Sequence, residues 1–252
     1  MLVFPCGSLT VTSVDSWRAI LTYHSLDDSG SVISVRPSVF ARHMEELAGQ
    51  GVNVVRLTEL PAAPAPALAL TFDDGFQNFF ESAAPVLARY NFPATVFLVT
   101  NYCGGANDWP SQPPDIPRLP LMSWPQIVEL SRAGIEFGAH TATHTNLAQL
   151  EETAMREEIL SSKQRIEEAT GRPVSAFAYP YGSMPEPAQR IVARHFAAGC
   201  STRLGWVTAE SRPEALERLD IYYLRYPFLI RRLFEPSVRG YLALRGALRE
   251  WA

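Results

Sequence analysis

The stretch Leu68-Ala-Leu-Thr-Phe-Asp73-Asp74-Gly75 is a short apolar run that ends in two adjacent carboxylates and a glycine. Its length and composition are typical of a buried strand, which the glycine then stops. Two like charges side by side are unfavourable at the end of such a strand. The pair therefore needs solvent, a cation, or a proton shared between the two acids.

A second apolar run, Ile135-Glu-Phe-Gly-Ala-His140-Thr-Ala-Thr-His144, ends in two histidines four residues apart. One carboxylate from Asp74 and two imidazoles from His140 and His144 would leave open positions for water and substrate, as in catalytic metal sites. This donor set suits Zn²⁺, Co²⁺, Ni²⁺ or Fe²⁺. We expect one divalent ion, with zinc as the first choice.

Apolar runs alternate with amphipathic segments along the chain, and this alternation predicts a parallel sheet. The sheet is either closed as a barrel or open and doubly wound, and in both the chemistry gathers at the carboxyl ends of the strands. Four of the predicted strands end in polar or special residues, at His24, Asp73-Asp74, His140 and Tyr179-Pro-Tyr-Gly182. The strands are expected at 18–24, 52–55, 67–72, 94–99, 135–139, 175–179, 199–202 and 221–224.

Composition excludes several classes of protein. The 252 residues are 47% hydrophobic and 19% charged, which describes a globular chain with an ample core. The net charge of −4 argues against nucleic acid as a partner. The three cysteines are far apart, and we expect free thiols. No apolar run is long enough for a membrane span, and the first residues do not resemble a signal peptide, so a cytoplasmic location is expected.

Charge is spread unevenly along the chain. From Tyr222 onward there are six arginines and two glutamates. The plain interpretation is a solvated helical face. The alternative is peripheral contact with an anionic surface, such as a membrane or a phosphorylated glycan carrier.

These residues suggest a division of labour in hydrolysis. Asp73 diverges from its neighbour Asp74, so it is free to act as general base on a water activated by the metal. His24, from another strand end, could protonate a leaving amine. The turn at Tyr181 could present its backbone N–H to a developing oxyanion. Each motif alone also has an ordinary structural interpretation, as a turn, a strand exit or a packed histidine.

Three motifs together resemble the polysaccharide deacetylases, the metal-dependent N-deacetylases of carbohydrate esterase type. They are Thr71-Phe-Asp73-Asp74-Gly75, His140-Thr141-x-x-His144 and Phe177-Ala-Tyr-Pro180-Tyr181-Gly182. The resemblance covers about residues 18–224, which implies a catalytic domain there, an N-terminal arm at 1–17 and a basic helical extension at 225–252. It implies a deformed (β/α) barrel of about seven parallel strands and removal of an N-acetyl group from an amino sugar. It also implies Asp73 as base, Asp74, His140 and His144 as metal ligands, and the Tyr181 amide at the oxyanion.

The chain departs from the family pattern in two places. The family often has an arginine before the third motif, tethering the catalytic aspartate; Tyr179 stands there, and Arg203 is the predicted substitute. The late Leu-x-His that supplies the acid is also missing. However, Thr22-Tyr23-His24 resembles the N-terminal Tyr-His of the subgroup that deacetylates poly-N-acetylglucosamine, which assigns the acid to His24.

The expected partner is an N-acetylated glycan or a carrier-linked sugar, and the long proline-rich loop at 101–121 is expected to form a rim of the site. Two alternatives remain at this stage. One is a cyclic-amide hydrolase of the allantoinase-like branch, which shares the fold. The other is a non-catalytic glycan-binding relative.

Overall fold

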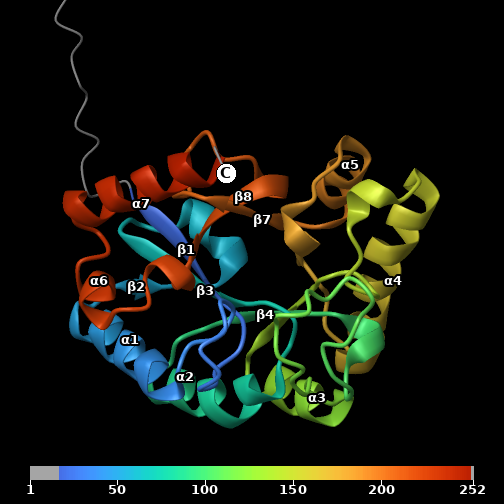
Figure 1. Ribbon diagram of the computed structural model, residues 1–252, viewed down its shortest axis with the longest axis horizontal. Helices are drawn as coiled ribbons and strands as arrows, with labels where there is room; N and C mark the ends of the chain where they lie inside the picture. Colours follow the sequence, from blue (N-terminus) through green and yellow to red (C-terminus); the bar gives the residue numbers. More distant parts are fainter. Residues whose placement is uncertain (1–16, 251–252) are drawn as a thin grey trace, which may run out of the picture.

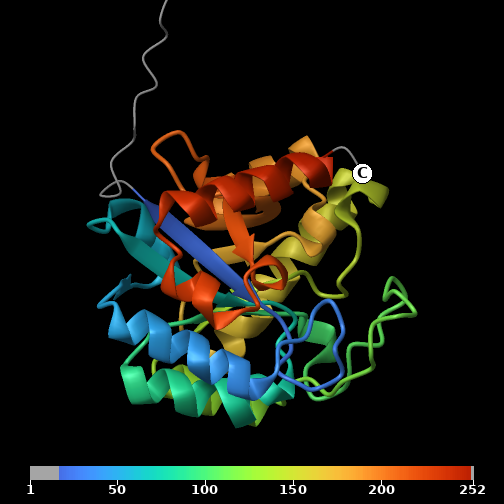
Figure 2. The ribbon, with the colours of Figure 1, turned by 60° about the vertical axis from the view of Figure 1, so that its left-hand side comes forward.

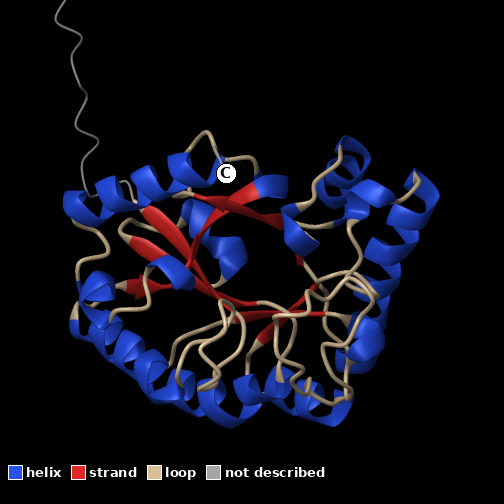
Figure 3. Ribbon diagram, viewed as in Figure 1, coloured by secondary structure: helices blue, strands red, loops and turns tan. Residues whose placement is uncertain are grey.

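The strands form a closed ring with the helices outside it, in a computed structural model that describes residues 17–250 (Figures 1 and 3). All strand pairs are parallel, and the ring closes because β1 pairs with both β8 and β3. Short β2 adds to the start of β3. The strands are β1 (Arg18–Tyr23), β2 (Asn53–Val54), β3 (Ala67–Phe72), β4 (Thr95–Leu98), β5 (Glu136–Ala139), β6 (Ala176–Ala178), β7 (Ala198–Leu204) and β8 (Leu216–Asp220). A ring of seven parallel strands confirms the predicted barrel and excludes the open sheet.

Alternation along each strand divides the core in two. In β3, Leu68, Leu70 and Phe72 belong to the cluster that also contains the helix residues, whereas Ala67 and Ala69 belong to an inner cluster. Successive strand residues point to opposite faces, so the first set lies under the helices and the second fills the barrel. Most inner strand residues are small, as Ala176 and Ala178 are. This leaves room for polar side chains at the mouth of the barrel.

Amphipathic helices cover the outside of the barrel, and Figure 2 shows them from the side. Their buried residues recur at helical spacing, such as Phe40, Met44 and Leu47 of α1. The helices are α1 (Pro37–Gly49), α2 (Ala84–Tyr90), α3 (Trp124–Arg132), α4 (Glu152–Thr170), α5 (Glu186–His195), α6 (Pro227–Arg231) and α7 (Pro236–Glu250).

The last strand differs from the prediction. The apolar stretch Ile221–Tyr223 is a 3-10 turn, and the strand comes before it as β8, although β8 contains Glu217, Arg218 and Asp220. The apolar character of the turn misled the prediction, because Ile221 and Tyr223 pack in the outer cluster rather than in the sheet. A π-helical segment, Phe79–Ala83, precedes α2.

The C-terminal helices pack on the barrel. Ile230 of α6 and Val238 and Leu242 of α7 join the outer cluster, and the Arg239 guanidinium lies 5.0 Å from the ring centroid of Trp17. Of the N-terminal arm predicted at 1–17, residues 1–16 lie outside the described residues, so the three-part division stays a prediction. Within residues 17–250, no helix combines the length and hydrophobicity needed to cross a membrane.

Candidate active site

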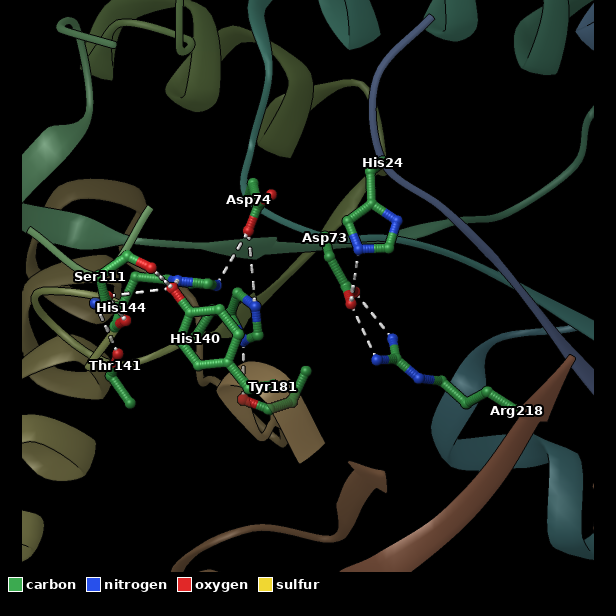
Figure 4. Close-up of polar contacts among 10 residues, drawn as sticks. His24, Asp73, Asp74, Ser111, His140, Thr141, His144, Tyr181 and Arg218 are labelled. Carbon is green, nitrogen blue, oxygen red and sulfur yellow. Dashed lines mark hydrogen bonds and ion pairs between the residues drawn. The ribbon is translucent and has the colours of Figure 1, made fainter. Parts of the chain in front are cut away.

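The polar strand ends meet at one mouth of the barrel (Figure 4). His24 and Asp73 directly follow β1 and β3 and continue the inward-facing alternation of Ile20 and Ala69. His140 directly follows β5, in which Phe137 and Ala139 face outward, so its side chain faces inward. Because the strands are parallel, their carboxyl ends lie at one edge, and these three side chains enter the same space. The structure thus brings together strand ends that lie at positions 24, 73 and 140 of the chain.

Asp74, His140 and His144 form a compact group of possible metal ligands. The Asp74 Oδ1 atom lies 3.5 Å from His140 Nε2 and 3.3 Å from His144 Nε2, and the ligand atoms all lie within 4.8 Å of one another. All three residues are buried. The Asp74 Oδ1 atom has no hydrogen-bond partner, which is unfavourable for a buried oxygen.

The His140 ring is oriented by a backbone carbonyl. Its Nδ1 atom lies 2.7 Å from Ala178 O, and a carbonyl oxygen can only accept, so His140 Nδ1–H donates. The lone pair of the neutral ring is then on Nε2, facing Asp74. Burial, together with neighbouring His144, lowers the pKa of His140 to about 4, so the ring is neutral near pH 7.

The His144 ring is oriented by a tyrosine instead. His144 Nδ1 lies 2.9 Å from the Tyr181 hydroxyl, which lies 3.0 Å from the backbone oxygen of Ser111. Burial raises the pKa of Tyr181, so the hydroxyl keeps its proton and donates it to that carbonyl. The hydroxyl oxygen then accepts from His144 Nδ1–H, and the lone pair of this ring is also on Nε2.

The Nε2 atoms of His140 and His144 and the Oδ1 atom of Asp74 therefore face one another with no proton between them. The pKa of Asp74 lies below its usual value, although burial alone would raise it, so the carboxylate is charged. One carboxylate and two Nε2 atoms in this arrangement fit a divalent cation, and their composition matches catalytic zinc-type sites.

Strained backbone marks the same site. Five non-glycine residues within 17–250 have positive φ, and four of them are Asp74, Thr141, His144 and Tyr181. Such conformations are unfavourable for ordinary side chains and persist only where the surroundings impose them. Gly75 also has positive φ, and a Cβ atom there would lie 2.7 Å from Leu98 Cδ2. The backbone conformation and the nearby Leu98 side chain therefore both favour glycine at position 75.

Glu158 of α4 holds the turn that carries His144. Its carboxylate accepts hydrogen bonds from Ala142 N at 2.9 Å, Thr143 N at 3.0 Å and Thr143 Oγ1 at 2.8 Å. Within the turn, His144 N donates to Thr141 Oγ1 at 2.9 Å. The long helix is thus tied to the metal-ligand turn by one side chain.

Asp73 is paired with an arginine that the sequence analysis missed. Arg218 of β8 donates from Nη1 to Oδ1 at 2.7 Å and from Nη2 to Oδ2 at 2.8 Å, and both side chains are buried. Burial alone would raise the pKa of Asp73, but the Arg218 guanidinium holds it well below its usual range. Asp73 is therefore an oriented carboxylate that remains ionised.

Arg203, the predicted partner of Asp73, lies elsewhere. Its side chain is half exposed, donates to Ala215 O at 3.2 Å and lies 3.8 Å from Glu217. The preceding Thr202 lines the cleft beside Asp73, so Arg203 points away from it. The sequence feature that could have identified Arg218 is its position in Leu216–Asp220. It lies two residues after Leu216, so its side chain faces the same way, into the barrel.

His24 lies on the Arg218 side of Asp73, away from the metal ligands (Figure 4). Its Nε2 atom is 3.8 Å from Asp73 Oδ2, and its side chain is one-quarter exposed. It can therefore reach both the Asp73 carboxylate and a bound molecule.

The proline-rich loop packs against His144. The Trp109 ring is buried and lies 4.3 Å, centroid to centroid, from His144. Ser111 Oγ donates to His144 O at 2.9 Å, besides receiving the Tyr181 hydroxyl at its carbonyl. The predicted rim is thus also a support for a metal ligand.

Comparison with known proteins decides the family. Residues 61–197, more than half of the chain, match the model of the polysaccharide deacetylase family. The chain belongs to the polysaccharide deacetylases. YxkH of Bacillus subtilis strain 168, whose name assigns it to the polysaccharide deacetylases, is 24% identical over 210 residues, 80% of this chain and 70% of YxkH.

A second relative is the poly-beta-1,6-N-acetyl-D-glucosamine N-deacetylase of Staphylococcus epidermidis. It is 27% identical over 137 residues, which are 51% of this chain. The chain covers 45% of that relative, so it spans about half of its length.

Solved structures agree on the fold. The Streptococcus pyogenes deacetylase PplD, in complex with acetate, superposes with a TM-score of 0.76 at 24% identity, covering 88% of this chain and all of PplD. IcaB from Ammonifex degensii gives a TM-score of 0.70 at 22% identity, covering 87% of this chain and 96% of IcaB. The predicted family and the deformed barrel are both confirmed.

Proposed function

We propose that this polysaccharide deacetylase hydrolyses the N-acetyl group of an amino-sugar residue in a glycan or glycoconjugate. The observation that carries the proposal is the pairing, at one barrel mouth, of the Asp74, His140 and His144 group with the ionised Asp73 held by Arg218. Hydrolysis of an amide needs an activated water, stabilisation of the oxyanion and a proton for the leaving nitrogen.

The residues of this chain divide those tasks. Asp73, fixed by Arg218, accepts a proton from the attacking water. His24, 3.8 Å from Asp73, donates a proton to the leaving nitrogen. The Tyr181 backbone N–H is the proposed donor to the oxyanion, while its side chain orients His144.

Asp74, His140 and His144 would hold a divalent ion, which would supply Lewis acidity for activating a water and polarising the acetyl carbonyl. We propose zinc for this ion, because two neutral imidazoles and one carboxylate with open positions are typical of catalytic zinc. Cobalt, nickel and iron share a preference for this donor set.

The names of the relatives support a glycan substrate over a cyclic amide, since the staphylococcal protein is named for poly-β-1,6-N-acetylglucosamine. A non-catalytic glycan-binding role is disfavoured by the Asp73–Arg218 pair. Such a role gives no reason to keep a buried, ionised carboxylate beside three metal-ligand side chains.

An acetate-release assay tests the proposal. Purified protein with added zinc is incubated with a β-1,6-linked and a β-1,4-linked N-acetylglucosamine tetramer, and with allantoin as a cyclic amide. We expect acetate from at least one tetramer and no opening of allantoin. Ring opening of allantoin without acetate release would favour the cyclic-amide hydrolase.

Peripheral membrane contact and a cytoplasmic location also remain proposals. Leu244 and Leu248 of α7 are exposed, which supports contact with a lipid surface, whereas Arg245 lies over the rings of Tyr223 and Tyr241. Cosedimentation with anionic vesicles at low salt tests the contact, and protein that stays wholly in the supernatant would contradict it.

A further inference from the structure

A cleft of about 320 Å³ opens beside Asp73 on the side away from the metal ligands. His24, Val32, Asp73, Asp220 and Tyr222 are among the residues that line it. Its volume is in the range of small-molecule sites, and it combines apolar side chains with a few polar groups, as such sites do.

The positions of the reacting groups indicate which part of the substrate this cleft holds. The acetyl group must approach Asp74 and the two histidines, while the leaving nitrogen must approach His24. Figure 4 shows the metal ligands and His24 on opposite sides of Asp73. The sugar that carries the nitrogen therefore extends toward His24, which is the side on which the cleft opens.

Two contacts fix the position of Tyr222 at the wall of this cleft. Asp220 accepts a hydrogen bond from Tyr222 N at 2.9 Å and so fixes the turn that follows β8. The Arg225 guanidinium lies 4.5 Å from the centroid of the Tyr222 ring and covers one face of it. Tyr222 is 39% exposed, and it lines the cleft.

A pyranose ring has the surface that fits such a wall. Its C–H groups form an apolar face that packs on an aromatic ring, and its hydroxyls, at the edges, need hydrogen-bonding groups. Val32, 55% exposed on the loop after β1, adds apolar surface to the cleft, and Asp220 and His24 add polar groups.

We propose that this cleft binds the amino-sugar ring whose N-acetyl group is removed, with Tyr222 as the platform on which the ring packs. The inference rests on the proposed deacetylation, and it assigns Tyr222 and Val32 to substrate recognition rather than to the chemical step.

Kinetics with an N-acetylglucosamine tetramer and zinc-loaded protein test this assignment. We expect Tyr222→Ala to raise KM about five- to tenfold, because an aromatic contact is lost, while kcat and bound zinc per chain stay unchanged. Tyr222→Phe keeps the ring and should restore KM. Phe228→Ala, an exposed aromatic of the same segment that does not line the cleft, is the matched control and should match wild type.

Val32→Trp gives a second test that does not depend on Tyr222. Val32 is exposed, so the larger ring should fill the cleft without disturbing the core, and it should also raise KM. An unchanged KM in both Tyr222→Ala and Val32→Trp would overturn the assignment. Wild-type protein that binds the tetramer without releasing acetate would instead contradict the proposed function, and NMR line broadening of the tetramer that Tyr222→Ala abolishes would still support the cleft.

Discussion

Arg218 donates two parallel hydrogen bonds, of 2.7 and 2.8 Å, to the two carboxylate oxygens of Asp73. The two residues are 145 positions apart in sequence and both are buried. The pair keeps Asp73 ionised in a place where burial alone would favour its neutral form. A third hydrogen bond, from Arg218 Nε to Ser201 O at 2.8 Å, fixes the guanidinium.

Arg218→Ala should therefore lower both stability and activity. Removing one partner of a buried ion pair costs about 3–5 kcal/mol, measurable by urea unfolding. Arg218 lowers the pKa of Asp73, so its loss raises that pKa. The acid limb of the pH–rate profile for acetate release should then move to higher pH. Arg203→Ala, the matched control, should change the unfolding free energy by less than about 0.5 kcal/mol, and an equal effect of both variants would contradict the assignment.

Tyr181→Phe separates the two roles of this residue. The variant loses the hydroxyl that accepts from His144 but keeps the backbone N–H. We expect zinc affinity to fall about 10- to 100-fold, as is typical when a hydrogen-bond partner of a metal ligand is removed. Acetate release at saturating zinc should return to the wild-type rate. Competition with a chromogenic chelator measures the affinity, and wild-type affinity in the variant would refute the orienting role.

His24→Ala should lower turnover without releasing metal. Loss of a general acid typically reduces the rate about 10²- to 10⁴-fold. Because His24 lies on the far side of Asp73 from the metal ligands, zinc per chain should stay at the wild-type value. Atomic absorption on dialysed protein checks this, and loss of zinc would make His24 a ligand instead.

His43 predicts a pH dependence of stability away from the site. It is buried on α1 between the Tyr23 hydroxyl at 3.1 Å and Arg225 O at 3.1 Å. Burial lowers its pKa from 6.5 to about 4, although the Arg225 carbonyl opposes the shift. The unfolded chain takes up this proton first as pH falls. The contribution to stability is therefore complete above about pH 6.5 and declines toward pH 4, by at most about 1.4 kcal/mol per pH unit.

Urea unfolding at pH 7 and pH 5 measures the effect. His43→Gln has no proton to gain in this range, so it should lose less stability than wild type between the two pH values. An equal loss in both proteins would show that His43 is not the group responsible.

Strand ends were the part of the site that the sequence revealed. Asp73, Asp74 and His140 follow apolar runs directly, and parallel strands must bring such positions to one edge. Arg218 was missed because it stands inside a strand whose polar residues hid the strand itself. The partners of the metal ligands were missed for another reason. Trp109 and Ser111 come from a loop without periodicity. The Tyr181 hydroxyl contacts His144 from a residue with positive φ, a backbone conformation that the sequence does not show.

Metal reconstitution tests most directly whether Asp74, His140 and His144 hold an ion that deacetylation needs. Protein stripped with a chelator is titrated with zinc, and bound zinc and acetate release from an N-acetylglucosamine tetramer are followed together, in wild type and in Asp74→Asn. We predict that wild-type activity rises in proportion to zinc up to one ion per chain, and that Asp74→Asn neither binds zinc at that concentration nor releases acetate. Acetate release by the stripped wild-type protein, or by Asp74→Asn, would contradict the account.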